Sequence, residues 1–136
     1  MFVRLKAYLA ALLFFLVVDA IWIAAFAGTY YQRELGGLLQ NDPNLVLFAV
    51  FYALYAAGIV VLAVMPALEA SAFRIALING GVLGGLAYGT FTVTNFAVIK
   101  GWSIGLVVSD IGWGITLTAL AALVGYLAGS RSYVSR

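Results

Sequence analysis

The chain has 136 residues, of which 65% are hydrophobic and only 9% are charged, and its mean hydropathy is +1.12. A soluble domain is about half apolar and a quarter charged, so we expect residues 1–136 to form a single integral membrane domain. The chain lacks both His and Cys, which excludes Ser-His-Asp and Cys-His nucleophiles and argues against haem, zinc, copper and iron–sulfur sites. We therefore expect no cofactor and no metal, although carboxylates remain compatible with a hard cation. The seven basic residues are scattered and form no stripe with interleaved aromatics, so nucleic acid is not expected as a partner.

Four apolar segments are long enough to cross a bilayer, which takes about 20 residues of helix. They cover residues 5–27, 45–65, 72–99 and 102–127. The first segment is followed by Ala25-Phe26-Ala27 but is longer than a signal-peptide core and carries Asp19, so we expect an uncleaved helix. The sequence therefore predicts an all-α fold, a four-helix transmembrane bundle.

Orientation is predicted from the Lys and Arg residues near the ends of the spans, because cytoplasmic loops carry the excess. Five lie on one side and two on the other, which predicts that both termini are cytoplasmic. The larger group is Arg4, Lys6, Arg74, Arg131 and Arg136, and the smaller is Arg33 and Lys100.

The connection between the first two spans, residues 28–44, would then be external. It mixes aromatic, charged and apolar positions around Tyr30, Tyr31 and Arg33. A short helix lying in the membrane interface, with its tyrosines at the level of the headgroups, fits this mixture. An ordinary ordered loop fits it equally well. We describe it as a short external interfacial segment.

Two acidic residues lie inside the predicted spans, and each is followed three residues later by tryptophan: Asp19 with Trp22, and Asp110 with Trp113. A carboxylate at membrane depth costs about 2.5–3.5 kcal/mol or more, so such a residue is a functional hypothesis by default. The alternative is that the pair only holds helices together. A similar motif in two spans of opposite direction is also a weak hint of inverted pseudo-symmetry.

The predicted topology places the polar side chains in one layer. Both acids lie about eight residues from the outer end of their spans, or roughly 12 Å at 1.5 Å per residue. No Lys or Arg is expected at this depth. The residues predicted to form a ligand or proton site are Asp19, Trp22, Tyr52, Tyr55, Tyr88, Thr92, Asn95, Asp110 and Trp113.

Each of the other members has a simpler explanation. Tyr52 and Tyr55 are more typical of packing or interfacial aromatics than of catalytic acids. Thr92 belongs to a residue type that usually bonds back to its own helix. Asn95 would make a modest clamp between helices.

Glycines at helical spacing predict close helix packing in the third and fourth spans. The predicted packing residues are Gly81, Gly85, Gly89, Gly112 and Gly114. Packing within the chain is favoured over a homodimer through a remaining glycine face. Beside Asp110, the last two glycines would also leave space for a ligand or water.

Several of these motifs together resemble a family of small bacterial membrane proteins, domain of unknown function 2177. They are Asp19-x-x-Trp22, Phe51-Tyr52-x-x-Tyr55-x-x-Gly58, Tyr88-Gly89-Thr90-Phe91-x-x-Thr94-Asn95, Trp102 and Asp110-x-x-Trp113-Gly114. The resemblance covers nearly the whole chain and implies a multi-pass protein of the bacterial inner membrane, but no activity. In the family pattern an acidic residue commonly stands at the position of Thr92, and a proline at that of Ser103. A mechanism that needs three acids is therefore in doubt here.

Three functions compete. The first is binding or transport of a small amphiphile or cation, with the two acids supplying charge or exchanging protons and the aromatics supplying cation–π contacts. The second is an accessory or assembly subunit of a larger membrane complex. The third is a membrane enzyme acting on a lipid or isoprenoid through paired acids, which the absence of His and Cys disfavours. Membrane lipid surrounds the protein in all three.

Overall fold

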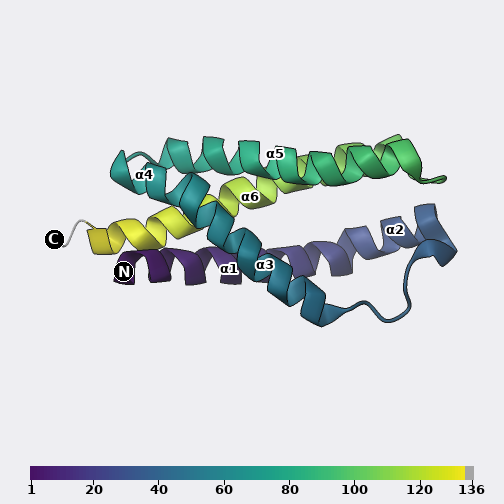
Figure 1. The fold of residues 1–136 in the computed structure, drawn as a ribbon, viewed down its shortest axis with the longest axis horizontal. Helices are drawn as coiled ribbons and strands as arrows, with labels where there is room; N and C mark the ends of the chain where they lie inside the picture. The colour runs from purple at the N-terminus through teal and green to yellow at the C-terminus, as the bar shows by residue number, and fades with distance from the viewer. Residues whose placement is uncertain (134–136) are drawn as a thin grey trace.

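A computed structural model describes residues 1–133, and in it four helices have the length and composition to cross a membrane (Figure 1). The all-α bundle is confirmed. Arg136, which entered the orientation count, lies outside the described residues. The first membrane-length helix comprises α1 (Phe2–Trp22), a π-helical turn η1 (Ile23–Ala27), α2 (Gly28–Leu35) and a 3₁₀ turn η2 (Gly36–Leu38). The second comprises α3 (Leu45–Ile59), a π-helical turn η3 (Val60–Val64) and α4 (Met65–Glu69). The third is α5 (Phe73–Val98), and the fourth is α6 (Ile104–Tyr133).

The helices alternate in direction, so the N-terminus and the end of α6 lie at the same end of the bundle (Figure 1). The opposite end holds α2, the connection 39–44 and the turn 99–103, and we call it the α2 end. The assignment of the termini to the cytoplasmic side stays a prediction.

α6 is the central helix, because it packs along both α5 and α1. Glycine makes the approach of α5 possible. A Cβ on Gly80 would lie 2.8 Å from the Thr118 carbonyl oxygen, and one on Gly84 would overlap the Gly114 carbonyl group. Gly80, Gly84 and Gly114 therefore hold the two helices at backbone contact.

The other predicted packing glycines behave differently. A Cβ on Gly81 or Gly85 would meet only the side chain of Ile115 or a neighbouring alanine, and one on Gly89 would just touch Ile111. At Gly112 a Cβ would meet no atom within 4 Å, so the prediction that it packs against a helix is wrong. The contact instead follows the face one residue earlier in α5, where Gly80 and Gly84 lie.

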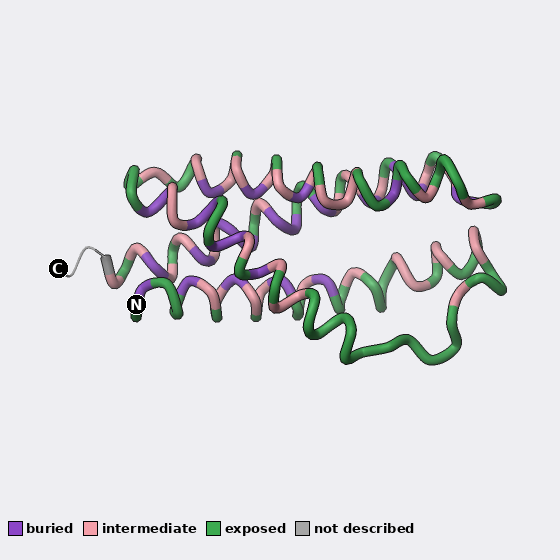
Figure 2. Tube along the Cα trace, viewed as in Figure 1, coloured by how far each residue is buried: buried purple, intermediate pink, exposed green. Residues whose placement is uncertain are grey.

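α3 crosses the bundle obliquely, and its first half lies away from α5 (Figure 1). Its residues near Leu45 are exposed, whereas purple buried segments mark the inner faces of the other helices (Figure 2). The buried ring of Phe15 in α1 holds α3 through edge-to-face contacts with Tyr52 and Tyr55, at centroid distances of 5.1 and 5.3 Å.

The first helix differs from prediction, since it continues to Leu38 instead of ending near Ala27. The apolar pattern stops at Ala27, but the helix does not, because a π turn carries the backbone on. The Gly28 N–H bonds to the Ile23 carbonyl, and a Cβ on Gly28 would lie 2.8 Å from that oxygen. Glycine thus permits the turn that joins α1 to α2, and the segment predicted to be interfacial is helical in residues 28–35.

The second helix also extends beyond its predicted end at Met65, to Glu69. Proline within a helix leaves the carbonyl four residues earlier without its donor. For Pro66 that carbonyl belongs to Leu62, and it accepts a hydrogen bond of 3.0 Å from the Asn79 side chain of α5. The helix therefore passes Pro66 because a neighbouring helix supplies the missing donor.

Candidate functional site

Asp19 of α1 is 4% exposed and receives hydrogen bonds at both carboxyl oxygens. The Tyr52 hydroxyl of α3 donates to Oδ2 over 2.6 Å, and the Trp113 indole N–H of α6 donates to Oδ1 over 3.0 Å. The carboxyl group therefore ties together three of the four membrane-length helices.

The two Asp-x-x-Trp motifs interlock around this carboxyl group. The acid of the first motif bonds to the tryptophan of the second, and the rings of Trp22 and Trp113 stack with centroids 4.3 Å apart and planes within 9°. The arrangement is not reciprocal, because the hydroxyl that donates to Asp110 comes from Tyr31, not from a tryptophan. The two motifs therefore do not make equivalent hydrogen bonds, as an inverted repeat would require.

Asp110 of α6, 8% exposed, forms a second hydrogen-bonded group nearer the α2 end. The Tyr31 hydroxyl of α2 donates to Oδ2 of Asp110. Thr92 of α5 lies beside the same carboxyl group and accepts a hydrogen bond of 3.0 Å from the Trp102 indole N–H. The Trp102 ring meets Tyr31 edge-on at 5.6 Å. The predicted single layer is therefore divided into two groups.

Tyr88 of α5 lies between the two groups. Its ring packs against Gly114, where any side chain would collide with it, and its hydroxyl is within electrostatic range of both Asp19 and Asp110. Among the described residues this hydroxyl makes no hydrogen bond. Gly114 therefore has two roles: its carbonyl group is the surface that Gly84 of α5 contacts, and its missing side chain leaves room for the Tyr88 ring.

The remaining predicted members lie at the edges. Tyr55 shares a hydrogen bond of 2.9 Å with the buried Thr118 hydroxyl and so joins α3 to α6. The Asn95 side chain makes no hydrogen bond within residues 1–133, so the structure does not bring it into either group. Thr92, unlike Thr90, bonds to another side chain instead of to its own helix.

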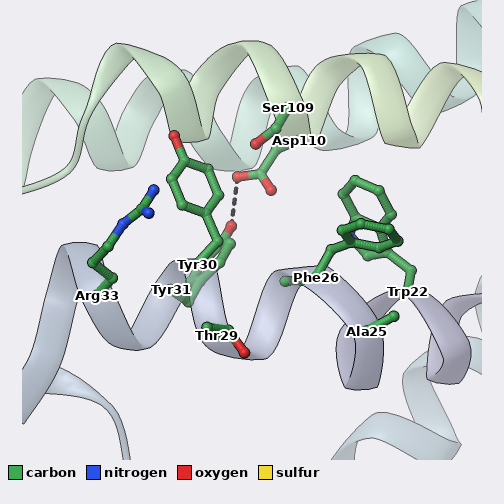
Figure 3. A pocket seen from close by; sticks show the side chains of 10 residues that line it. Trp22, Ala25, Phe26, Thr29, Tyr30, Tyr31, Arg33, Ser109 and Asp110 are labelled. Atoms are coloured by element: carbon green, nitrogen blue, oxygen red, sulfur yellow. Dashed lines mark hydrogen bonds between the residues drawn. The ribbon is translucent and has the colours of Figure 1, made fainter.

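An open cavity of about 360 Å³ lies between the first helix and α6 (Figure 3). One face of the first helix supplies a row of side chains at three- and four-residue spacing, and Ser109 and Asp110 of α6 stand opposite. The row runs Trp22, Phe26, Tyr30 and Arg33.

The charged and apolar parts of this cavity are separated along its length. Arg33, Tyr30 and Tyr31 gather on one side of the close-up view, Trp22 lies on the other, and Asp110 stands between them (Figure 3). The rings of Trp22 and Phe26 are 5.4 Å apart and form the apolar part. The cavity therefore offers an aromatic surface that leads to a carboxyl group.

No Lys or Arg was expected at the depth of the two acids to pair with them, and within the described residues Arg33 pairs with neither, although it lines the same cavity as Asp110. Because the first helix continues past Ala27, it brings Arg33 to the wall of the same cavity. The guanidinium lies over the Tyr30 ring at 5.1 Å, and its ion pair is with Glu34, with Nε 3.6 Å from Oε1.

The sequence-based site missed Tyr31, Trp102 and Arg33. Arg33 could have been found from the sequence, because Trp22, Phe26, Tyr30 and Arg33 follow one another at helical spacing. This spacing was overlooked because the predicted span was ended where the apolar residues end. Within residues 1–133 no group of three or more acidic, His or Cys side chains is arranged to hold a metal ion.

Comparison with known proteins gives one match. No curated protein and no solved structure matches this chain. The pattern of a family described as predicted membrane protein, domain of unknown function 2177, matches residues 4–127. This is nearly the whole length over which the four helices extend, so the resemblance seen in the motifs is confirmed. The chain belongs to this family of predicted membrane proteins.

Proposed function

We propose that this membrane protein binds a small amphiphilic molecule in the cavity between its first helix and α6, with a cationic head at Asp110. The observation that supports this is a nearly buried carboxyl group on the wall of an aromatic cavity of about 360 Å³. Binding pockets for small molecules are typically roughly 300–1,000 Å³, mostly apolar, with a few placed polar groups. The cavity lies at the small end of that range.

Asp110 has acceptor capacity left for a ligand. An ionised carboxylate offers about four lone-pair positions, and the Tyr31 hydroxyl and the neighbouring Thr92 take only part of them. Asp19 also has two donors, Tyr52 and Trp113, but they bond to its two different oxygens, and Asp19 does not line the cavity. We therefore assign ligand binding to Asp110 and a structural role to Asp19.

The aromatic residues suit the rest of such a ligand. Arg33 covers one face of the Tyr30 ring and Trp113 covers one face of the Trp22 ring. The remaining surface of these rings lines the cavity together with Phe26, and an uncovered aromatic face attracts a cation. The apolar part of the ligand would lie along Trp22 and Phe26, and its cationic head would reach Asp110. Transport would be an extension of this binding, in which Asp110 exchanges its ligand for a proton.

Calorimetric titration of the purified protein in nanodiscs tests the proposal. The probes are benzyltrimethylammonium and benzyl alcohol, which share a ring but differ in charge. The cation should bind, and the Asp110→Asn variant should bind it about tenfold more weakly. A quaternary ammonium donates no hydrogen bond, so the loss is that of its Coulomb attraction to the carboxylate, which at about 4 Å amounts to about 1 kcal/mol in water and about 4 kcal/mol near a protein surface. Asp42→Asn, an exposed acid in the connection 39–44, is the matched control.

Equal affinity of the cation for the wild type and for Asp110→Asn would refute the proposal, provided that both proteins melt at the same temperature. Preference for benzyl alcohol would refute it too. For transport, cation uptake driven by a pH gradient in proteoliposomes should be lost in Asp110→Asn and kept in Asp42→Asn.

A further inference from the structure

Arg33 is a largely exposed cation on the wall of the proposed binding cavity. Its side chain is 73% exposed, and its ion pair with Glu34 uses Nε at 3.6 Å, longer than a hydrogen bond. Within the described residues its two terminal nitrogens make no hydrogen bond, and the guanidinium meets the face of the Tyr30 ring at 5.1 Å. These nitrogens form the fork with which arginine binds a phosphate at two points.

The two charges of the cavity are held apart by fixed tyrosines. The Tyr30 hydroxyl lies so close to Gly105 of α6 that a side chain there would collide with it. Tyr31 is fixed by its hydrogen bond to Asp110. The Arg33 guanidinium lies over the Tyr30 ring at 5.1 Å, and in the close-up view this ring stands between Arg33 and Asp110 (Figure 3).

We propose that the head of the ligand is zwitterionic, with an ammonium group at Asp110 and a phosphate group at Arg33. This inference rests on the proposed function and narrows its ligand class. A purely cationic ligand would meet repulsion from Arg33, and a purely anionic one would meet repulsion from Asp110. Such repulsion is how a site rejects the wrong partner, so the pair selects a head that carries both charges.

The same head chemistry occurs in a free phosphoethanolamine and in the headgroup of a membrane lipid. The apolar part of the cavity is formed by Trp22 and Phe26, and Phe26 is itself 63% exposed, so apolar surface of the first helix reaches from the cavity to the outside of the bundle. An acyl chain of a lipid would find apolar surface there, whereas a free zwitterion would leave it uncovered. The experiment therefore includes both sources.

The test is calorimetric titration in detergent with four probes: free phosphoethanolamine, dihexanoyl phosphatidylethanolamine, hexylamine and hexyl phosphate. The lipid or the free zwitterion should bind at least tenfold more tightly than either probe with a single charge. Arg33→Gln should weaken the binding of the zwitterionic probe about tenfold, which is the loss of affinity expected for one charge-assisted contact. The same substitution should not weaken the binding of hexylamine. Lys100→Gln removes an exposed cation at the same end of the bundle and should change neither affinity by more than about twofold.

The outcomes separate the two proposals. Tight binding of the lipid alone supports a membrane-lipid ligand, and tight binding of the free zwitterion supports a soluble one. If hexylamine binds as tightly as both zwitterions, or if Arg33→Gln leaves zwitterion affinity unchanged, the zwitterion inference is overturned while binding at Asp110 stands. If no amine-bearing probe binds the wild type, both proposals fail.

Discussion

Replacing Gly84 by alanine should push α5 away from α6. The new Cβ would overlap the Gly114 carbonyl group and lie 2.8 Å from the Thr118 Cβ, where carbon atoms normally sit about 3.5–4.0 Å apart. The Gly114 carbonyl belongs to the backbone of a long helix and cannot rotate away as a flexible side chain could. The helices must therefore separate by on the order of 1 Å.

The size of the effect follows from two opposing terms. Alanine is favoured over glycine in a helix interior by about 0.5–1 kcal/mol. Overpacking of a tight contact costs about 1–3 kcal/mol, and a gap of about 1 Å forfeits up to half of the dispersion energy of each facing atom pair. We expect Gly84→Ala to lower the free energy of unfolding by about 2 kcal/mol.

Gly112→Ala is the matched control, because a Cβ there meets no atom within 4 Å. It should raise the free energy of unfolding by about 0.5 kcal/mol through helix propensity alone. Both variants can be unfolded in mixed micelles by raising the fraction of dodecyl sulfate, with the near-ultraviolet circular dichroism of the buried aromatics as the signal. If Gly84→Ala is as stable as Gly112→Ala, the assignment of the helix contact is refuted.

Other changes test the remaining contacts. Tyr52→Phe removes a donor from the buried Asp19 carboxyl and should lower the free energy of unfolding by about 1–3 kcal/mol in the same micelle assay; wild-type stability would contradict the bond. Asn79→Ala leaves the Leu62 carbonyl without this donor and should lower the free energy of unfolding by about 1 kcal/mol in the same assay; an unchanged free energy of unfolding would contradict the hydrogen bond. Gly28→Ala places a methyl group 2.8 Å from a carbonyl of the π turn; it should weaken benzyltrimethylammonium binding several-fold, and unchanged affinity would show that the turn does not shape the cavity.

The spans could be predicted from sequence because a bilayer demands about 20 apolar residues, and that demand is local. The importance of Asp19 and Asp110 was also predictable, since a carboxyl group surrounded by apolar side chains requires donors from elsewhere. Trp113 was among the residues predicted to form the site. That it serves Asp19, the acid of the other motif, depends on how α1 and α6 are rotated about their axes.

The end of the first helix could not be predicted from hydropathy, because the helix outlasts its apolar run. Tyr31 and Arg33 look like residues of an interfacial loop when the span is ended at Ala27. In the structure a π turn, permitted by Gly28, continues the helix and places them against α6. π turns interrupt helices often at functional sites, and this one forms part of the cavity wall.

The two acids, equivalent in the sequence, have different surroundings. Asp19 is bonded at both oxygens by donors from α3 and α6 and does not line the cavity. Asp110 opens to a cavity that also presents an arginine. We therefore assign the proposed ligand site to Asp110 and a structural role to Asp19, whose donor Trp113 stacks on Trp22 beside the cavity.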